Sequence, residues 1–244
     1  MKKTFTILTT ALIILVSFKT KAQDTKEYVK SYISFLGGQS LPVSNFGQSN
    51  YSNNSAGFAK KGTVFGLEGA YYFYKNLGFV ATLSYVDQGE LSQNDVQNLS
   101  DGYNASFNKL YTNVTAVNRY NSLNLLGGPQ YSFVYHKFTL DLRATAGIIK
   151  SYSTPSIQIQ YTEGNSTLVT FSQNSSKGDA FAYGGGAGLR FSLGEHWDVN
   201  LRGNYLNSAG IKISNTNNNG SVGRFVTKQP ITEIQTTLGI SLHL

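Results

Sequence analysis

The sequence predicts an all-β fold, an eight-stranded antiparallel up-and-down transmembrane β-barrel, and three observations lead to it. Aromatic residues make up 13% of the 244 residues and charged residues only 14%, a composition that favours strands over helices. Apolar and polar residues alternate along most of the chain, as they do where successive side chains of a strand face opposite ways. Long and short connections then separate the alternating segments in strict turn.

Residues 1–22 are predicted to be a signal peptide. Lys2 and Lys3 precede an apolar run over 7–18, and Ala22 ends the segment with a small residue before a polar start, which is the pattern of a secretory signal. The apolar run of about a dozen residues is shorter than the roughly twenty that a membrane-spanning helix needs. We therefore expect cleavage after Ala22 and a single barrel domain over residues 23–244.

Eight segments carry the alternation of a strand. In chain order they are 28–38, 62–73, 78–87, 120–134, 138–150, 181–192, 197–207 and 231–244. The pattern is clearest at 138–150, where Leu140 and Leu142 share one face while Asp141 and Arg143 share the other. Each strand is therefore expected to have one apolar face and one polar face.

Glycine and proline mark two irregular places within these strands. Pro129 follows Gly127 and Gly128 inside the fourth segment, and because proline cannot donate to a ladder, we predict a bulge or a bend there. The glycine run at 184–186 lacks the strand-to-helix context of a phosphate-binding loop. It is predicted to allow tight packing or bending of the strand.

The long and the short connections lie at opposite ends of the predicted barrel. The long ones are 39–61, 88–119, 151–179 and 209–228. Short turns join the other strands, and within the third long loop the segments 157–161 and 167–171 can extend the barrel as a hairpin. Transmembrane barrels have this architecture, with short periplasmic turns and long extracellular loops.

The direction of the apolar face separates this fold from a soluble, lipocalin-like barrel that holds a ligand inside. Periodicity alone does not choose between them. The signal peptide, the alternating connections and the aromatic residues near strand ends favour the transmembrane barrel, whose interfaces carry aromatic girdles. These aromatic residues are Tyr28, Phe73, Tyr74, Phe79, Phe133, Tyr135, Phe138, Phe191 and Trp197.

The polar faces would then line the interior with charge. The candidate network consists of Glu68, Asp141, Arg143, Arg190, Arg202 and Glu233, with Lys30 near one end. An eight-stranded barrel is just wide enough for side chains to fill it, and isolated buried charge is costly. We therefore predict an internal salt-bridge plug, and the alternative is a narrow charge-lined channel whose pairs can open.

Catalytic, metal and cofactor sites are not expected. The histidines, His136, His196 and His243, fall in short turns or at the end of the last strand, on the predicted periplasmic side, and neither GxSxG nor HExxH occurs. Such motifs are what acyl-transfer and zinc chemistry require. The absence of cysteine excludes a thiol nucleophile, a disulfide and Cys-ligated zinc.

The formal net charge of +7 does not point to a nucleic-acid partner. The first 22 residues hold four lysines and no acid, so the remainder carries a net charge of +3. A mildly basic surface of this kind is weak evidence for phosphate-backbone binding.

With these features, the chain resembles the small outer-membrane β-barrel domain proteins of Gram-negative bacteria, of the OmpA-like or PorT-like type. The resemblance covers the mature chain. It rests on Ala22-Gln23, ISFLGG at 33–38, LLGGPQYSF at 125–133, GGAGLRF at 185–191 and LGISLHL at 238–244. It implies an integral outer-membrane protein that is surrounded by outer-membrane lipid and lipopolysaccharide. It also implies insertion by the outer-membrane insertion machinery, and we expect a monomer.

The resulting functional hypothesis is a non-enzymatic outer-membrane barrel with a structural or surface-interaction role through its long extracellular loops. The first alternative is a channel for ions or small solutes. The second is a soluble periplasmic, lipocalin-like barrel. The sequence identifies no surface partner.

Overall fold

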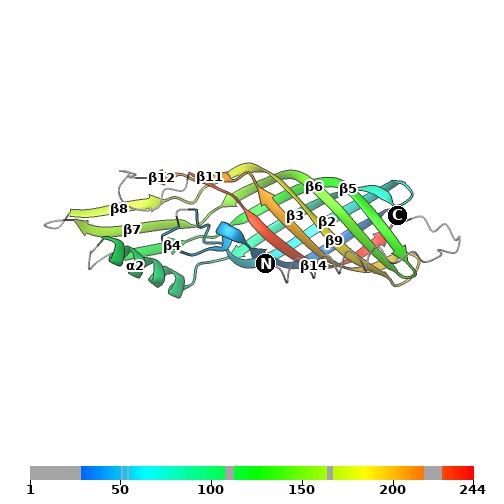
Figure 1. Cartoon of the computed structure of the whole chain (residues 1–244), viewed down its shortest axis with the longest axis horizontal. Helices are drawn as coiled ribbons and strands as arrows, with labels where there is room; N and C mark the ends of the chain where they lie inside the picture. Colours follow the sequence, from blue (N-terminus) through cyan, green and yellow to red (C-terminus); the bar gives the residue numbers. More distant parts are fainter. Residues whose placement is uncertain (1–28, 51, 54, 108–112, 164–166, 217–226) are drawn as a thin grey trace, which may run out of the picture.

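The computed structural model describes residues 29–50, 52–53, 55–107, 113–163, 167–216 and 227–244. A closed barrel forms one end of the elongated molecule, and an extension of strands and one helix forms the other (Figure 1). The predicted signal peptide, 1–22, lies outside the described residues. Among the helices of the described segments, none has the length and apolar character that crossing a membrane requires.

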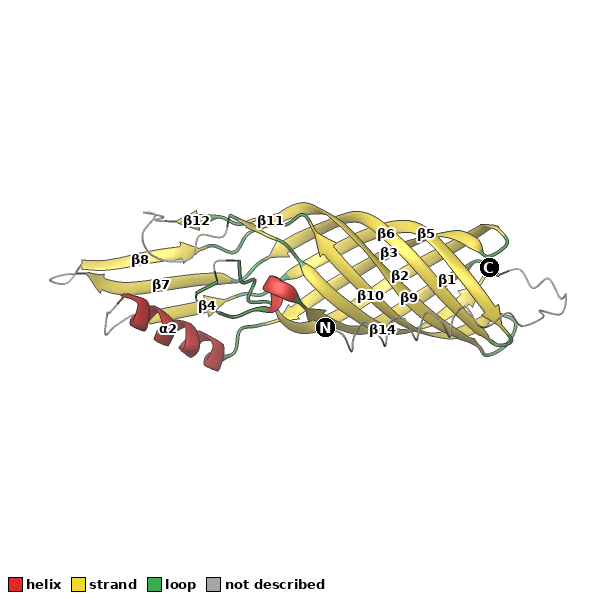
Figure 2. Ribbon diagram, viewed as in Figure 1, coloured by secondary structure: helices red, strands yellow, loops and turns green. Residues whose placement is uncertain are grey.

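The predicted eight-stranded barrel is confirmed. Its strands are β1 (Tyr32–Pro42), β2 (Lys60–Tyr74), β3 (Leu77–Gly89), β5 (Asn121–Tyr135), β6 (Phe138–Ser153), β9 (Gly178–Ser192), β10 (Trp197–Ser208) and β14 (Thr232–His243). They close in the order β1-β14-β10-β9-β6-β5-β3-β2 (Figure 2). Every neighbouring pair is antiparallel. The first strand lies over Tyr32–Pro42 rather than 28–38.

The apolar faces of the strands point outwards. Phe35 and Phe65 are 70% and 61% exposed, whereas Glu68 is 2% and Arg202 is 1% exposed. A soluble ligand-binding barrel has the reverse arrangement, with its apolar face inside. The outward apolar surface and the polar interior are those of a barrel that spans a lipid bilayer.

The predicted bulge at Pro129 is wrong. Pro129 pairs in register with Phe79 of β3, and the register of β5 with β6 is the same before and after it. The ladder with β6 is interrupted between Gly127 and Gln130 without an added residue, because proline has no N–H to donate, and the Pro129 side chain is exposed. Beside it, Gly128 lies so close to the carbonyl of Ala144 that any side chain there would collide.

The extension has its own sheet. It consists of β4 (Asn113–Val117), β7 (Ser156–Glu163), β8 (Thr167–Gln173) and β12 (Asn215–Thr216), in the order β12-β8-β7-β4. The β7–β8 pair confirms the hairpin predicted in the third long loop. Two shorter elements lie between barrel and sheet, the 3-10 helix η1 (Ser44–Gly47) and the ladder of β11 (Ile211–Lys212) with β13 (Lys228–Gln229).

A helix, α2 (Gln93–Phe107), replaces the polar loop that the sequence predicts at 88–119. Its start is a capping box, in which the Ser92 hydroxyl accepts from the Asp95 N–H at 3.2 Å and the Asp95 carboxylate accepts from the Ser92 N–H at 3.0 Å. This exchange satisfies backbone donors that the first turn leaves free. Leu99 and Tyr103, one turn apart, are buried against the sheet.

Apolar side chains fill the junction between barrel and extension. Phe46 of η1 packs edge-on to Tyr120 with ring centroids 4.8 Å apart. The same buried cluster contains Ile149 and Leu206 from the barrel wall and Ile211 from β11, together with other apolar residues around the junction. The end of the barrel opposite the short turns is therefore closed by a packed apolar core.

Candidate functional site

The first part of the barrel interior is organised around Glu68 of β2. Its carboxylate pairs with Arg143 of β6, Oε2 to Nη1 at 2.5 Å, and with Arg202 of β10. The Tyr32 hydroxyl donates to the same carboxylate at 3.0 Å. One carboxylate thus joins strands from opposite sides of the barrel.

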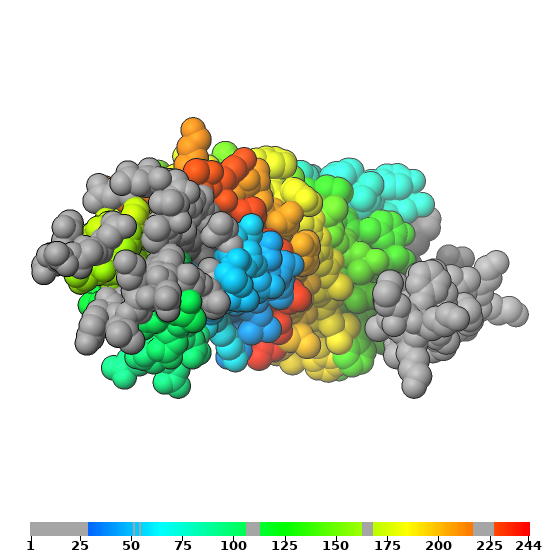
Figure 3. Space-filling view, turned by 60° about the vertical axis from the view of Figure 1, so that its left-hand side comes forward, coloured from blue at the N-terminus to red at the C-terminus, as the bar shows by residue number. Residues whose placement is uncertain are grey.

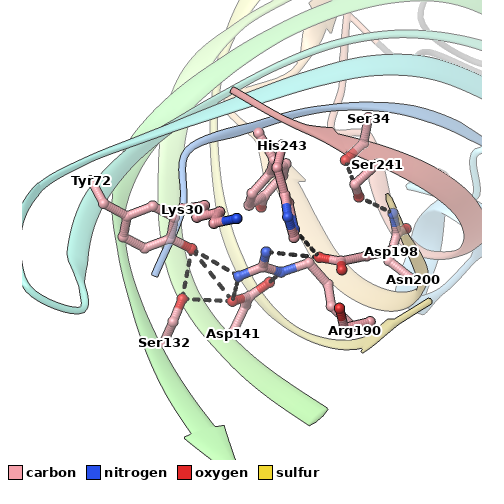
Figure 4. Close-up of polar contacts among 12 residues, drawn as sticks. Lys30, Ser34, Tyr72, Ser132, Asp141, Arg190, Asp198, Asn200, Ser241 and His243 are labelled. Carbon is pink, nitrogen blue, oxygen red and sulfur yellow. Dashed lines mark hydrogen bonds and ion pairs between the residues drawn. The ribbon is translucent and has the colours of Figure 1, made fainter. Parts of the chain in front are cut away.

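The second part lies nearer the short turns and is organised around Arg190 of β9 (Figure 4). Its guanidinium donates to Asp141 from Nε at 2.8 Å and from Nη2 at 3.1 Å. It also donates to Asp198 from Nη1 at 3.2 Å. The Ser132 hydroxyl completes the Asp141 environment with a hydrogen bond of 2.6 Å.

Tyr32 connects the two parts. Two guanidinium groups contact its ring, with the central carbons of Arg190 and Arg202 4.3 and 5.4 Å from the ring centroid. Its hydroxyl accepts from Gln130 at 3.1 Å, and Gln130 also donates to the Tyr72 hydroxyl. Cation–π contact adds to the hydrogen bonds where water is excluded, so the interior is one continuous polar network.

A glycine on the inner face of β9 gives the arginines their space. A Cβ atom at Gly188 would lie 3.2 Å from Arg202 Cγ and 3.4 Å from Arg143 Nη2. The inward glycines Gly184 and Gly186 likewise face the backbone of β10 at close range. These inward glycines of β9 therefore allow close packing inside the barrel.

The network balances its charge. Glu68, Asp141 and Asp198 face Arg143, Arg190 and Arg202, and all six side chains are buried. A buried ion pair repays its desolvation only with good geometry and further hydrogen bonds. The tyrosine, glutamine and serine groups supply several of these bonds, whereas Arg143 Nε and Nη2 and Asp198 Oδ1 have no hydrogen-bond partner among the described residues. The arrangement links strands across the barrel interior.

The structure brings together five of the six residues proposed from the sequence, and Glu233 lies apart. Its carboxylate accepts from Ser40 at 2.7 Å, Gln88 at 2.7 Å and Gln235 at 2.6 Å. Among the described residues, no cation pairs with it. Neutral donors therefore replace an arginine near the closed end of the barrel.

Sequence reasoning missed four members of the network: Asp198, Tyr32, Tyr72 and Gln130. Asp198 lies on the polar face of β10. Its alternation with the apolar Trp197 and Val199 could therefore have identified it as an inward residue. The two tyrosines are harder to detect, because an aromatic side chain on either face fits a strand pattern. Alternation with exposed neighbours such as Ile33 and Phe73 gives their inward direction, but the groups that they contact follow only from the register and closure of the barrel.

A cavity of about 390 Å³ opens at the short-turn end. It is lined by Lys30, Lys137, Arg190, Glu195, Asp198 and His243, among others. Lys30 Nζ donates to the Glu195 carbonyl at 3.1 Å and so ties the start of the described chain to the β9–β10 turn. The lining residues belong to the short-turn end of the barrel and include Arg190 and Asp198 of the network.

His243 is the histidine with a buried carboxylate partner. Its Nε2 lies 2.7 Å from Asp198 Oδ2 and its Nδ1 lies 3.0 Å from the Glu195 carbonyl oxygen. Both ring nitrogens of His243 therefore lie within hydrogen-bonding distance of acceptor oxygens.

The comparison with known protein families agrees with this architecture. The family model described as outer membrane protein beta-barrel domain matches residues 8–225. Among solved structures, surface protein A (NspA) of Neisseria is 10% identical with a TM-score of 0.47, covering 88% of this chain and 97% of its own. Ail of Yersinia pestis is 13% identical with a TM-score of 0.42, covering 88% and 98%.

A third structure, the N-terminal barrel domain of OprF of Pseudomonas aeruginosa, is 13% identical with a TM-score of 0.35, covering 89% of this chain and 100% of its own. Curated protein sequences give no match to the chain.

Proposed function

Because the chain belongs to the outer membrane protein beta-barrel domain family, we propose that it is a non-enzymatic outer-membrane barrel that acts through the extension on its long-loop side. The family and the fold point to the outer membrane. The signal peptide at 1–22 remains the predicted route of export.

The observation that carries the proposal is that the long loops fold into a structure of their own. Strands β4, β7, β8 and β12 form a sheet, and α2 packs on it over a separate apolar core. Loops that connect strands need no such core. A folded extension that projects from the membrane-facing barrel is a rigid platform for contact with a surface partner.

The interior supports a structural role rather than transport. The polar network fills the barrel between the open cavity and the apolar junction. Paired, buried charges on facing strands support a filled lumen, because an eight-stranded barrel is just wide enough for side chains to fill it. The same observations disfavour the channel hypothesis, and the outward apolar face disfavours the soluble barrel.

A loop-trimming experiment tests the proposal. Residues 91–118 and 155–176 are each replaced by a short Gly-Ser linker in cells that lack the native copy, and folding is checked by the heat-dependent gel shift of the barrel. Surface attachment and cell–cell aggregation are then compared with wild type. We expect the trimmed barrel to fold and insert without restoring the wild-type phenotype.

The matched control keeps the extension and changes the cavity at the short-turn end, through Lys137→Gln in the β5–β6 turn. This variant should restore the phenotype fully. Full restoration by the trimmed barrel would contradict the proposal, because the barrel alone would then be sufficient.

A further inference from the structure

One face of the extension sheet carries uncharged polar side chains, and we propose that it binds an uncharged, polyhydroxylated glycan. This neutral face is defined by its central row, Thr115, Gln158, Ser172 and Thr216, and by Gln160 further along β7. The inference rests on the proposed function and deepens it, because it names the chemical class of the surface partner.

Backbone register places the central row side by side across the four strands. Thr115 of β4 lies opposite Gln158 of β7, and Gln158 lies opposite Ser172 of β8. Ser172 in turn lies opposite Thr216 of β12. Opposite residues direct their side chains to the same face. Since neighbouring strands lie about 4.8 Å apart, the row is about 14 Å long.

The helix α2 covers the other face of the sheet. Val114, Ile157 and Ile159 alternate with members of the row and are buried in one cluster with Leu99 and Tyr103 of α2. Successive residues of a strand point to opposite faces, so the neutral face points away from the helix. In Figure 3 the extension is turned towards the reader, and the green α2 and the yellow-green β7 and β8 lie on different sides of it.

The two glutamines of the neutral face are available to a ligand. Gln158 and Gln160 are partly exposed, and they share a face because they are two residues apart on β7. Within the described segments, neither side-chain amide forms a hydrogen bond with another residue. Each amide has two N–H donors and a carbonyl acceptor. It can therefore bind two adjacent hydroxyl groups of a sugar at once, one as donor and one as acceptor.

Electrostatic complementarity selects an uncharged occupant. Matching charge brings partners together and excludes wrong ones, and among the described residues of the neutral face there is no acid, lysine or arginine to attract an ion. The large exposed apolar residues, Val117 and Leu168, lie at the ends of β4 and β8 and not in the central row. Because two sheets that pack face to face need apolar inner surfaces, a second copy of this chain fits the face less well.

The dimensions of the neutral face suit a chain of sugars. The spacing of about 4.8 Å between strands is comparable to the length of one sugar ring, so successive sugars would meet successive strands. Each hydrogen bond to a sugar replaces one to water, and its net contribution is modest. Attachment through several copies of the barrel in one membrane would add avidity to weak single sites.

Glycan binding by the purified, folded full-length barrel in lipid nanodiscs tests the site. Dextran, mannan and galactan are the neutral probes, and each is compared with its own sulfated form by biolayer interferometry. At least one neutral glycan should bind, and its sulfation should weaken binding on the order of tenfold, because the face offers no cation to a sulfate group. Binding of none of the three, or tighter binding of the sulfated forms, would overturn the site.

A matched pair of variants locates the binding. Gln158→Ala/Gln160→Ala should weaken binding of the neutral glycan on the order of tenfold, whereas Gln93→Ala/Gln97→Ala, at exposed positions of α2, should leave it unchanged. Amide hydrogen exchange across α2 checks that the extension stays folded. Equal binding by the two variants would refute the role of the neutral face.

A charged variant keeps the test decisive if the alanine variant does not fold. Gln158→Lys/Gln160→Lys adds two cations to the neutral face and should reverse the preference, so that the sulfated glycan binds more tightly than the neutral one. An unchanged preference for the neutral form would show that the glycan binds elsewhere.

Two outcomes separate the competing explanations. Dimers of the wild-type barrel that disappear in the alanine variant, measured by light scattering without glycan, would assign the face to a second copy and refute the glycan. Loss of surface attachment on loop trimming without any glycan binding would refute the glycan alone. Full attachment by the trimmed barrel would refute the proposed function itself.

Discussion

Glu68 Oε2 and Arg143 Nη1 lie 2.5 Å apart inside the barrel, although their strands, β2 and β6, are separated by β3 and β5 in the sheet. The pair therefore crosses the interior and does not follow the wall. Arg202 reaches the same carboxylate from β10. One buried acid consequently ties three strands that share no backbone ladder, which links the filling of the lumen to the stability of the barrel.

Removing this acid should destabilise the barrel. Glu68→Gln leaves Arg143 and Arg202 buried without their anion, so the free energy of unfolding should fall by about 3–5 kcal/mol. Urea unfolding in lipid vesicles, followed by the heat-dependent gel shift, measures the change. Glu90→Gln is the control, because Glu90 pairs on the surface with Arg119 and should change stability by at most about 1 kcal/mol.

The inner face of β9 should tolerate no side chain at Gly188. Gly188→Val would place atoms against Arg202 Cγ and Arg143 Nη2 and should cost about 1–3 kcal/mol through overpacking. Gly203→Val is the matched control, since no atom lies within 4 Å of a Cβ there. Equal stability of the two variants in the same urea assay would refute the role given to Gly188.

The helix of the extension should depend on its cap. Ser92→Ala removes the hydroxyl that accepts from the Asp95 N–H and should cost about 1 kcal/mol of local stability. Amide hydrogen exchange across Gln93–Phe107 should accelerate about fivefold, while exchange in the barrel strands stays unchanged. Asn98→Ala, at an exposed position within the helix, provides a comparison outside the cap.

Acid should loosen the contact between α2 and the barrel rim. Partial burial by itself raises the pKa of Asp95, but the hydrogen bonds from Lys60 at 2.7 Å and from Ser92 outweigh it and hold that pKa below its ordinary value. A lowered folded-state pKa gives stability that is present above the unfolded pKa and is lost as pH falls through the folded one.

We therefore expect the amide signals of α2 in NMR spectra to be constant between pH 6 and 8 and to change below about pH 4. Asp95→Asn should remove the pH dependence. A transition at neutral pH would show that another group controls the helix.

The sequence was sufficient for the strands because each carries a clear alternation, as Leu140 to Arg143 illustrate. It was not sufficient for α2, whose polar composition concealed a capping box at Ser92 and an apolar stripe at Leu99 and Tyr103. The candidate network depended on more than alternation. Alternation gives the direction of a side chain, but only the register and closure decide which inward charges meet, which is why Glu233 lies apart from the arginines.

The most direct test of the account is single-channel recording of the folded, purified protein in a planar bilayer. We predict a silent barrel, because the Glu68–Arg143 and Arg190–Asp141 pairs fill the interior and the Phe46–Tyr120 cluster closes its far end. Steady ion conductance that falls in Arg143→Gln or Arg202→Gln protein would contradict this, and the interior would then be a charge-lined pore.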